Sequence, residues 1–364
     1  MRPSPLDEYP IHQSTLSLGR VGTSDTRFYD RGYFNGHDHE SDTFFVAGLG
    51  VYPNLGLSDA FLMVRRDDRL RTLCFSDQVA TRRLEQAVGP FRVEVVDPLR
   101  RLRLVCDDGP DGLAADLTWH SSFPAVFEPP QLVLGDEAAA HHAAYDTTRF
   151  AQVGRWSGEL QVDGEQIVVG RETWTGFRDR SWGVRPMGTP TPRGEVPERW
   201  AHGFWWTYVP LQFEDFFVMV VASESPDGER RMNEAVRVRT DGSVENLGWP
   251  RFDIAYLAGT RLPVAARIEL TDARGEPLVI DIEVATAVPL GMGSGYVTDW
   301  EWVHGMPMGP NWSRRRSFDL RDPEIAALGA IGVTDHAVRA RLGDQVGWGM
   351  FEHACVGPHR PSGF

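Results

Sequence analysis

Two aromatic segments of the chain each carry a histidine that could move a proton. If the backbone is extended over 200–208 and over 296–304, side-chain alternation places that histidine on the same face as several aromatic rings. The residues on these faces include His202, Trp206, Tyr208, Tyr296, Trp300, Trp302 and His304. Histidine titrates near neutral pH, a tyrosine hydroxyl can bind a substrate oxygen, and aromatic rings can enclose an apolar ligand or stabilise a carbocation. We therefore predict a pocket for a large apolar ligand with His202, Tyr208 and His304 as catalytic groups. The alternative is that the rings only fill a barrel core.

Carboxylic acids could supply a stronger acid to the same pocket. Protonation of an isolated C=C bond needs a carboxyl group that burial keeps neutral. The candidates are Asp179, Glu301 and Glu352. Each could instead be the buried partner of an arginine, because buried acids are usually paired. Asp299 alternates away from the neighbouring tryptophans, so a regular strand keeps it out of the pocket.

The composition excludes several classes of protein. The chain has 364 residues, a formal net charge of −14 and no lysine, so Schiff-base enzymes and Walker A nucleotide enzymes are excluded. An acidic chain is a poor candidate for binding nucleic acid or an anionic membrane. The three distant cysteines and the lack of an apolar leader or a long apolar stretch predict a cytoplasmic protein without a transmembrane segment. The oligomeric state is left open.

We also predict that the protein binds no metal and no cofactor. His37 and His39 would share one face of an extended segment and are of metal-ligating type. No third, distant ligand is identifiable, so we expect a solvated loop there.

The pattern of the chain is that of an all-β protein. Runs rich in Val, Ile, Phe, Tyr and Trp are broken by turn residues about every ten positions. The Asp-Gly pairs at 163–164 and 241–242 predict hairpins. Helix is expected only over 323–329, with Asp322 as its N-cap, and over 334–342.

A Pro- and Gly-rich segment at 186–197 is the best candidate for a domain boundary. Similar hairpin sequences follow Phe44 on one side of it and Phe216 on the other, which suggests a duplicated β unit. We predict two β domains, residues 1–188 and 189–364.

Four motifs in chain order resemble the carotenoid 1,2-hydratase (hydroxyneurosporene synthase) and AttH-like superfamily. They are 179–183 (DRSWG), 203–206 (GFWW) with 211–215 (LQFED), 300–301 (WE) and 347–352 (GWGMFE). The resemblance implies two lipocalin-like (calycin) antiparallel β-barrels with a hydrophobic substrate and no cofactor. Characterised relatives hydrate isoprenoid double bonds or guide the cyclisation of polyenes. Trp205 stands where the family has an aspartate, and Trp302 where it has a glycine.

On this resemblance the pocket walls would be formed mainly by tryptophans. The predicted substrate-binding residues are Trp182, Trp205, Trp206, Tyr296, Trp300, Trp302 and Trp348. We predict a cofactor-independent lyase (hydratase), isomerase or cyclase that acts on an isoprenoid, steroid or polyene-like molecule by acid–base chemistry. The alternatives are a non-catalytic carrier of such a ligand and a carbohydrate-active module, which would need two carboxylates about 5–10 Å apart across an open cleft.

Overall fold

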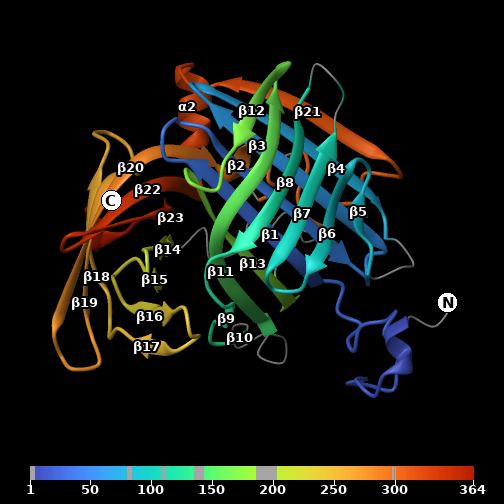
Figure 1. Ribbon diagram of the computed structural model, residues 1–364, viewed down its shortest axis with the longest axis horizontal. Coiled ribbons are helices and arrows are strands. Elements are labelled where there is room, and N and C mark those ends of the chain that lie inside the picture. Colours follow the sequence, from blue (N-terminus) through green and yellow to red (C-terminus); the bar gives the residue numbers. More distant parts are fainter. Residues whose placement is uncertain are drawn as a thin grey trace.

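The protein folds into two large antiparallel β-sheets that lie side by side (Figure 1). The computed structural model describes residues 5–79, 84–107, 109, 112–134, 143–185, 203–296, 299 and 301–364. The first sheet has 14 strands in the order β21-β4-β3-β2-β1-β13-β11-β8-β7-β6-β5, and β9, β10 and β12 pair with β11. The second has nine strands in the order β17-β16-β15-β14-β23-β22-β20-β19-β18.

The elements have the following bounds. The strands of the first sheet are β1 (Phe28–Asp38), β2 (Phe44–Tyr52), β3 (Leu57–Arg66), β4 (Arg69–Gln78), β5 (Gln86–Val88), β6 (Phe91–Asp97), β7 (Arg101–Asp107), β8 (Ala114–Ser121), β9 (Val126–Phe127), β10 (Gln131–Leu134), β11 (Ala143–Val162), β12 (Glu165–Val169), β13 (Trp174–Val184) and β21 (Trp312–Asp319). Those of the second are β14 (Phe204–Gln212), β15 (Phe216–Glu224), β16 (Arg230–Arg239), β17 (Val244–Asn246), β18 (Arg251–Tyr256), β19 (Pro263–Thr271), β20 (Pro277–Pro289), β22 (Thr334–Leu342) and β23 (Gln345–Val356). The helical segments of the described chain are η1 (Pro5–Glu8), η2 (Leu290–Met292), α2 (Pro323–Gly329) and η3 (Arg360–Ser362).

The two sheets share one topology. In each sheet, the first four strands in chain order lie next to one another, as β1 to β4 and as β14 to β17. The last of the remaining strands, β13 or β23, pairs with the first strand, β1 or β14. This makes β1 equivalent to β14, β2 to β15 and β13 to β23. The similar hairpins in the sequence, β2–β3 and β15–β16, occupy equivalent places. The predicted all-β, lipocalin-like fold with two curled antiparallel sheets and a short helix near the C-terminus is confirmed.

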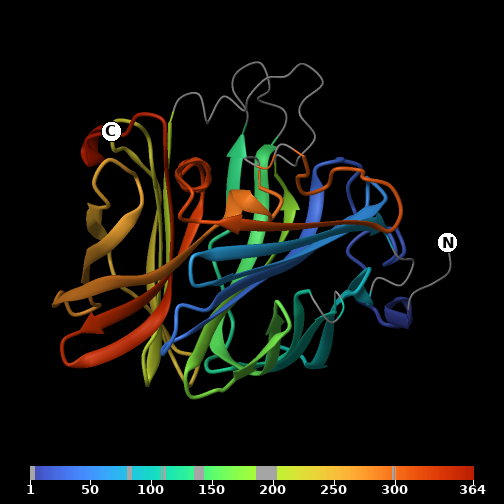
Figure 2. The same cartoon turned by 90° about the horizontal axis from the view of Figure 1, so that it is seen from above.

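Three large apolar cores hold this arrangement together. One, which includes Trp156, lies within the first sheet, and another, which includes Ile268, lies within the second. The third contains side chains of both sheets, among them Phe177 and Met350, so the sheets pack directly on each other. Figure 2 shows the second sheet, yellow to red, beside the blue and green strands of the first. Polar groups within this third core lie in a layer covered by both sheets.

Most of the predicted local elements are confirmed. Turns join β11 to β12 at Asp163-Gly164 and β16 to β17 at Asp241-Gly242. Helix α2 begins after Asp322, whose side chain accepts the N–H of Glu324. The helix expected over 334–342 is wrong, because this segment is strand β22. Its backbone pairs with β20 on one side and β23 on the other, and this pairing overrides helix propensity.

Two other expectations for local structure are wrong. The described residues of 296–304 form turns rather than a strand, because the backbone N–H of His304 donates to the carbonyl of Gly295 and closes a loop. His37 does not lie in a solvated loop. It is buried in β1, where the backbone pairs with β2 and β13.

Strand β21 comes from the C-terminal half of the sequence but pairs with β4 of the first sheet. The predicted boundary between 188 and 189 lies outside the described residues, so the division into 1–188 and 189–364 stays a prediction. Within the part of the chain that the structure describes, every helix is too short or too polar to cross a membrane.

Buried histidines make the folded state sensitive to acid. Burial lowers the pKa of His336 to about 4 and that of His353 to about 3. The unfolded chain takes up protons at these groups below about pH 6.5, and the folded chain does not until the lower pKa is reached. We expect the free energy of unfolding to fall between pH 6.5 and 4 by up to ~1.4 kcal/mol per pH unit for each histidine.

Denaturant unfolding at pH 7, 6 and 5 measures this dependence. His336→Gln is expected to reduce the slope by up to ~1.4 kcal/mol per pH unit. Phe351→Leu, which removes packing next to both histidines, should lower stability equally at every pH. An unchanged slope in His336→Gln would contradict the prediction.

Candidate functional site

Three neighbouring strands of the second sheet place a row of polar side chains against the first sheet. Tyr208 on β14 lies opposite Glu352 on β23, which lies opposite Asp335 on β22. Directly opposed residues of an antiparallel sheet share one face, with their Cβ atoms about 5 Å apart. The register therefore brings two carboxyl groups and a phenol together within the layer between the sheets.

Asp335 and Glu352 form a pair of neighbouring carboxyl groups. Burial raises the pKa of both groups, and the neighbouring charge of Glu352 raises that of Asp335 further. The Oδ1 atom of Asp335 is buried and receives no N–H or O–H from the described residues. Like charges on neighbouring carboxyl groups oppose each other, so the pair favours the form that keeps one proton. The pKa of each group is shifted in the direction that a carboxylic acid able to donate a proton requires.

Side chains from both sheets orient the carboxyl pair. The Tyr33 hydroxyl of the first sheet donates to Oδ2 of Asp335. The indole Nε1 of Trp206 donates to Oε1 of Glu352 at 2.5 Å. The amide of Asn35 donates to the Tyr33 oxygen at 3.2 Å, and a backbone N–H of β13 holds Asn35 in turn. The pair is therefore fixed where the two sheets meet.

A second tyrosine crosses between the sheets in the opposite direction. The Tyr208 hydroxyl donates at 2.5 Å to Oε1 of Glu128, a buried residue that follows β9. Nη1 of Arg149 lies 3.5 Å from the other Glu128 oxygen. Burial raises the pKa of Glu128, and Arg149 opposes that rise. Tyr33 on β1 and Tyr208 on β14 thus lie on equivalent strands, and each donates to a carboxyl group outside its own sheet.

Asp179 lies on the same layer from the side of the first sheet. It is opposite Tyr33 in the pairing of β13 with β1, as Glu352 is opposite Tyr208 in the pairing of β23 with β14. Burial raises the pKa of Asp179, against the opposing charges of Arg149 and Arg31. Asp179 and Glu352 both keep part of their surface accessible. Both acids therefore have a pKa raised by burial and still keep some surface that a bound ligand could contact.

Aromatic rings form the walls around these acids. Phe177 lies between the two tyrosines, with ring centroids 6.1 Å from Tyr33 and 5.4 Å from Tyr208. Trp206 stacks on Tyr208 at 6.2 Å with an interplanar angle of 13°. Flat apolar walls with few polar groups are typical of small-molecule sites, and the ring faces would attract a developing cation.

Tyr296 and His304 lie beside this cluster, next to strands β1 and β3. The Tyr296 oxygen accepts a hydrogen bond from Nη2 of Arg31 at 3.1 Å. Nδ1 of His304 lies 3.3 Å from Oδ1 of Asp59. Burial is the largest cause that lowers the pKa of His304 to about 4, so its ring is neutral at neutral pH.

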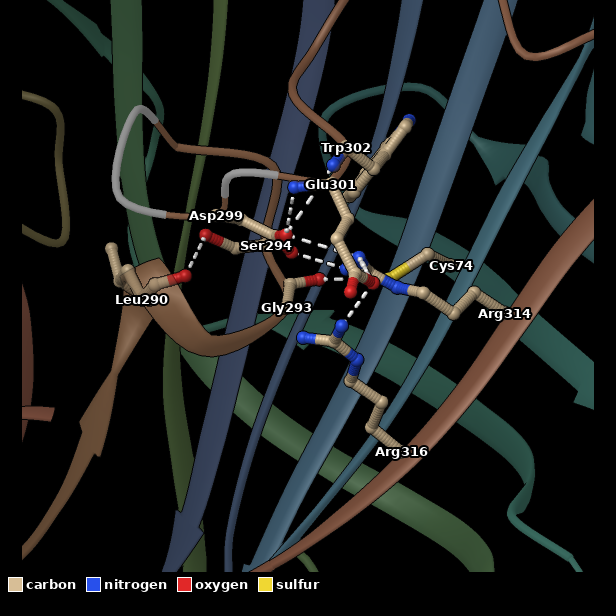
Figure 3. A network of polar contacts seen from close by, with 9 residues as sticks. All are labelled: Cys74, Leu290, Gly293, Ser294, Asp299, Glu301, Trp302, Arg314 and Arg316. Atoms are coloured by element: carbon tan, nitrogen blue, oxygen red, sulfur yellow. Dashed lines mark hydrogen bonds and ion pairs between the residues drawn. The ribbon is translucent and has the colours of Figure 1, made fainter. Parts of the chain in front are cut away.

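Glu301 and Trp302 lie in a different network, which surrounds Arg314 (Figure 3). The Arg314 guanidinium forms ion pairs with Asp299 and Glu301, and its Nη2 contacts the Cys74 sulfur at 3.7 Å. The Glu301 side chain is 63 % exposed, whereas Trp302 is fully buried. Asp299 is thus a buried ion-pair partner.

The remaining predicted residues lie away from the carboxyl pair. Trp205 points to the opposite face of β14 and stacks on His359. Trp182 is on the opposite face of β13 from Asp179 and packs against Phe127. Trp348 is four residues before Glu352 on β23 and stacks on His39. His202 and Trp300 lie outside the described residues.

The sequence analysis missed several groups of the site. They are Tyr33, Asp335, Glu128, Arg149 and Arg31. The register of the hairpin β22–β23 was a usable signal for Asp335, whereas the others depend on contacts between distant segments.

Other parts of the described chain are poorer candidates. A surface hollow of about 290 Å³ lies between the β3–β4 and β11–β12 turns, and ion pairs such as Arg71–Asp163 occupy its polar groups. Among the described residues, no three His, Cys, Asp or Glu side chains gather in a way that could hold a metal ion.

The fold is that of solved AttH-like proteins. A provisionally named AttH from Nitrosomonas europaea matches 91% of this chain and 93% of its own, with a TM-score of 0.58 and 14% identity. Kievitone hydratase from Nectria haematococca matches 92% of each chain, with a TM-score of 0.51 and 12% identity. CghA matches 92% of this chain and 89% of its own, with a TM-score of 0.52 and 13% identity. The predicted resemblance is confirmed for the fold alone, and a specific likeness to carotenoid 1,2-hydratase stays a prediction.

The chain belongs to the family of unknown function DUF8625, whose family model matches residues 4–364. No curated protein sequence matches it.

Proposed function

We propose that this protein is a cofactor-independent enzyme that moves protons to and from a hydrophobic small molecule held between its two sheets. The observation that carries the proposal is the carboxyl pair, Asp335 and Glu352, whose pKa values burial raises and which accepts hydrogen bonds from Tyr33 and Trp206. A carrier of apolar ligands gains nothing from two uncompensated acids, whereas an acid catalyst needs a carboxyl group that stays protonated near neutral pH.

In the proposed reaction the carboxyl pair is the acid. Its proton forms a bond to a carbon or a carbonyl oxygen of the substrate, and the ring faces of Trp206 and Tyr208 stabilise the cationic character that develops. In isomerisation or cyclisation, a proton then leaves another carbon and returns to the pair. In hydration, water forms the new C–O bond and its second proton is released to a carboxylate, for which Asp179 is the candidate.

The likeness to solved structures supports this class of activity without fixing the reaction. Kievitone hydratase is by its name a hydratase, and its fold is similar to that of this chain. We propose a lyase or an isomerase/cyclase, with an isoprenoid, steroid or polyene-like substrate as in the sequence-based prediction.

Incubation of the protein in D2O with isoprenoid, steroid and polyketide compounds, followed by mass spectrometry, tests the proposal. Hydration is expected to add the mass of one D2O, isomerisation to add carbon-bound deuterium, and cyclisation without exchange to change retention time at unchanged mass. Heat-denatured protein is the control. If compounds bind but return unchanged, the protein is a carrier and not an enzyme. If none of them binds, the proposed substrate class is wrong.

A further inference from the structure

Arg31 is a buried cation without a carboxylate partner in the part of the chain that the structure describes. Its side chain projects from β1 into the layer between the sheets, and the residue is 5% exposed. Among the described side chains, its Nη2 donates a hydrogen bond to the Tyr296 oxygen. Nη1 is buried and has no hydrogen-bond partner among the residues that the structure describes. Guanidinium groups remain charged at any physiological pH, so this charge needs compensation.

The other acids of this layer have partners of their own. Asp59 accepts from the Tyr52 hydroxyl at 3.0 Å and from the backbone N–H of Gly305 at 2.8 Å, and His304 contacts it as well. Glu128 is paired with Arg149, and the two carboxyls of the pair face each other.

Asp179 is the remaining acid near Arg31. It lies two residues before Ser181, the residue opposite Arg31, on the same face of β13. Its charge attracts Arg31, yet no ion pair or hydrogen bond joins them in the described chain. The protein thus holds a strong donor in a buried layer, and among the described residues its Nη1 meets no acceptor.

The position of Arg31 relates it to the carboxyl pair. Arg31 and Tyr33 are two residues apart on one face of β1, a spacing of roughly 7 Å along a strand, and Tyr33 donates to Asp335. A ligand group at Arg31 would therefore lie within one small molecule's length of the acid.

We propose that Arg31 binds an anionic oxygen of the ligand, so that the substrate is a hydrophobic molecule with an acidic head group such as a carboxylate or an acidic enol. This inference rests on the proposed function for the site, and it adds the chemical class of the substrate. Arginine suits this role because its planar, weakly hydrated fork matches carboxylate geometry.

Binding of matched acids and alcohols tests the inference without turnover. The probes are dodecanoate with dodecan-1-ol, and 1-pyrenebutyrate with 1-pyrenebutanol, titrated by calorimetry or fluorescence anisotropy. A charge-assisted hydrogen bond contributes about 10- to 150-fold in affinity, so the wild type should bind at least one acid about tenfold or more tightly than its alcohol. Equal affinities, or no binding by either pair, would overturn the inference.

Variants of Arg31 test the residue itself. Arg31→Gln is expected to weaken acid binding about tenfold or more and to leave alcohol binding within about twofold. Arg31→Lys should recover part of the acid preference, and Arg171→Gln, at an exposed site, should behave as the wild type. Equal weakening of acid and alcohol by Arg31→Gln would overturn the assignment, and circular dichroism checks that each variant is folded.

The outcomes separate this inference from the proposed function. If the protein prefers acids but catalyses no proton transfer, the role of Arg31 in binding an anion stands and the proposed enzymatic activity is wrong. If it catalyses proton transfer but does not prefer acids, the proposed activity stands and the role of Arg31 is wrong.

Discussion

Replacing Glu352 with Gln is expected to lower kcat by about 10²- to 10⁴-fold, the usual contribution of a positioned acid. Gln is nearly isosteric with Glu and can still accept the Trp206 N–H and bind Asp335, so the sheets should stay packed. What it removes is one of the two acids. Steady-state turnover of the substrate identified in D2O measures the effect.

The partner variant and a control sharpen this prediction. Asp335→Asn should lower kcat by a similar factor. The double variant should lower kcat little more than either single variant, because the two residues act as one unit. Glu283→Gln changes an exposed glutamate on β20 and should keep wild-type turnover. If Glu352→Gln retained more than about a tenth of wild-type kcat, the pair would not be the acid.

The pH dependence of the reaction follows from the same pair. Burial and proximity raise the pKa of the pair, so the proton is present at low pH and is lost as pH rises through that raised value. We expect kcat to be flat at lower pH and to fall at higher pH. Because a coupled pair titrates as a unit, the midpoint of the falling limb gives an apparent pKa of the pair and not of either residue alone. In Glu352→Gln the limb should move to lower pH, because burial still raises the pKa of Asp335 but the neighbouring charge is gone.

The carboxyl pair shows how much of the site the sequence could have given. Glu352 was a candidate, but Asp335 was hidden by the expectation of a helix over 334–342. Had that segment been taken as a strand, the turn at Gly343-Asp344 would have set the hairpin register. Pairing Leu342 with Gln345 places Asp335 opposite Glu352.

Other parts of the site could not have come from sequence patterns. Tyr33 and Asp335 are 302 positions apart, and Tyr208 and Glu128 are 80 apart. Local periodicity reports which face of a strand is buried but not which sheet covers it. The fold was accessible because strand spacing and turn chemistry are local, and the four weak motifs pointed to proteins of the same fold. The site was not, because it forms where two similar sheets meet.

The largest expected loss of stability comes from breaking the buried contact of Arg314 with Asp299. Arg314 lies on β21, the strand that ties the C-terminal half to the edge of the first sheet, and its side chain is 12 % exposed. Asp299 is 2 % exposed and also accepts the backbone N–H groups of Glu301 and Trp302. Arg314→Met would leave a buried carboxylate without its counterion, which costs about 3–5 kcal/mol.

A double-mutant cycle separates this charge effect from lost packing. Asp299→Asn in the Arg314→Met background should restore part of the stability, because it removes the orphaned charge and keeps an acceptor for the backbone. Glu301→Gln removes an exposed partner of the same arginine and should cost less than about 1 kcal/mol. A loss of stability below about 1 kcal/mol for Arg314→Met would contradict the prediction.

Asp299 also holds the segment next to Tyr296, whose oxygen accepts a hydrogen bond from Arg31. Arg314→Met should therefore weaken binding of the acid probes at Arg31 even where the protein remains folded.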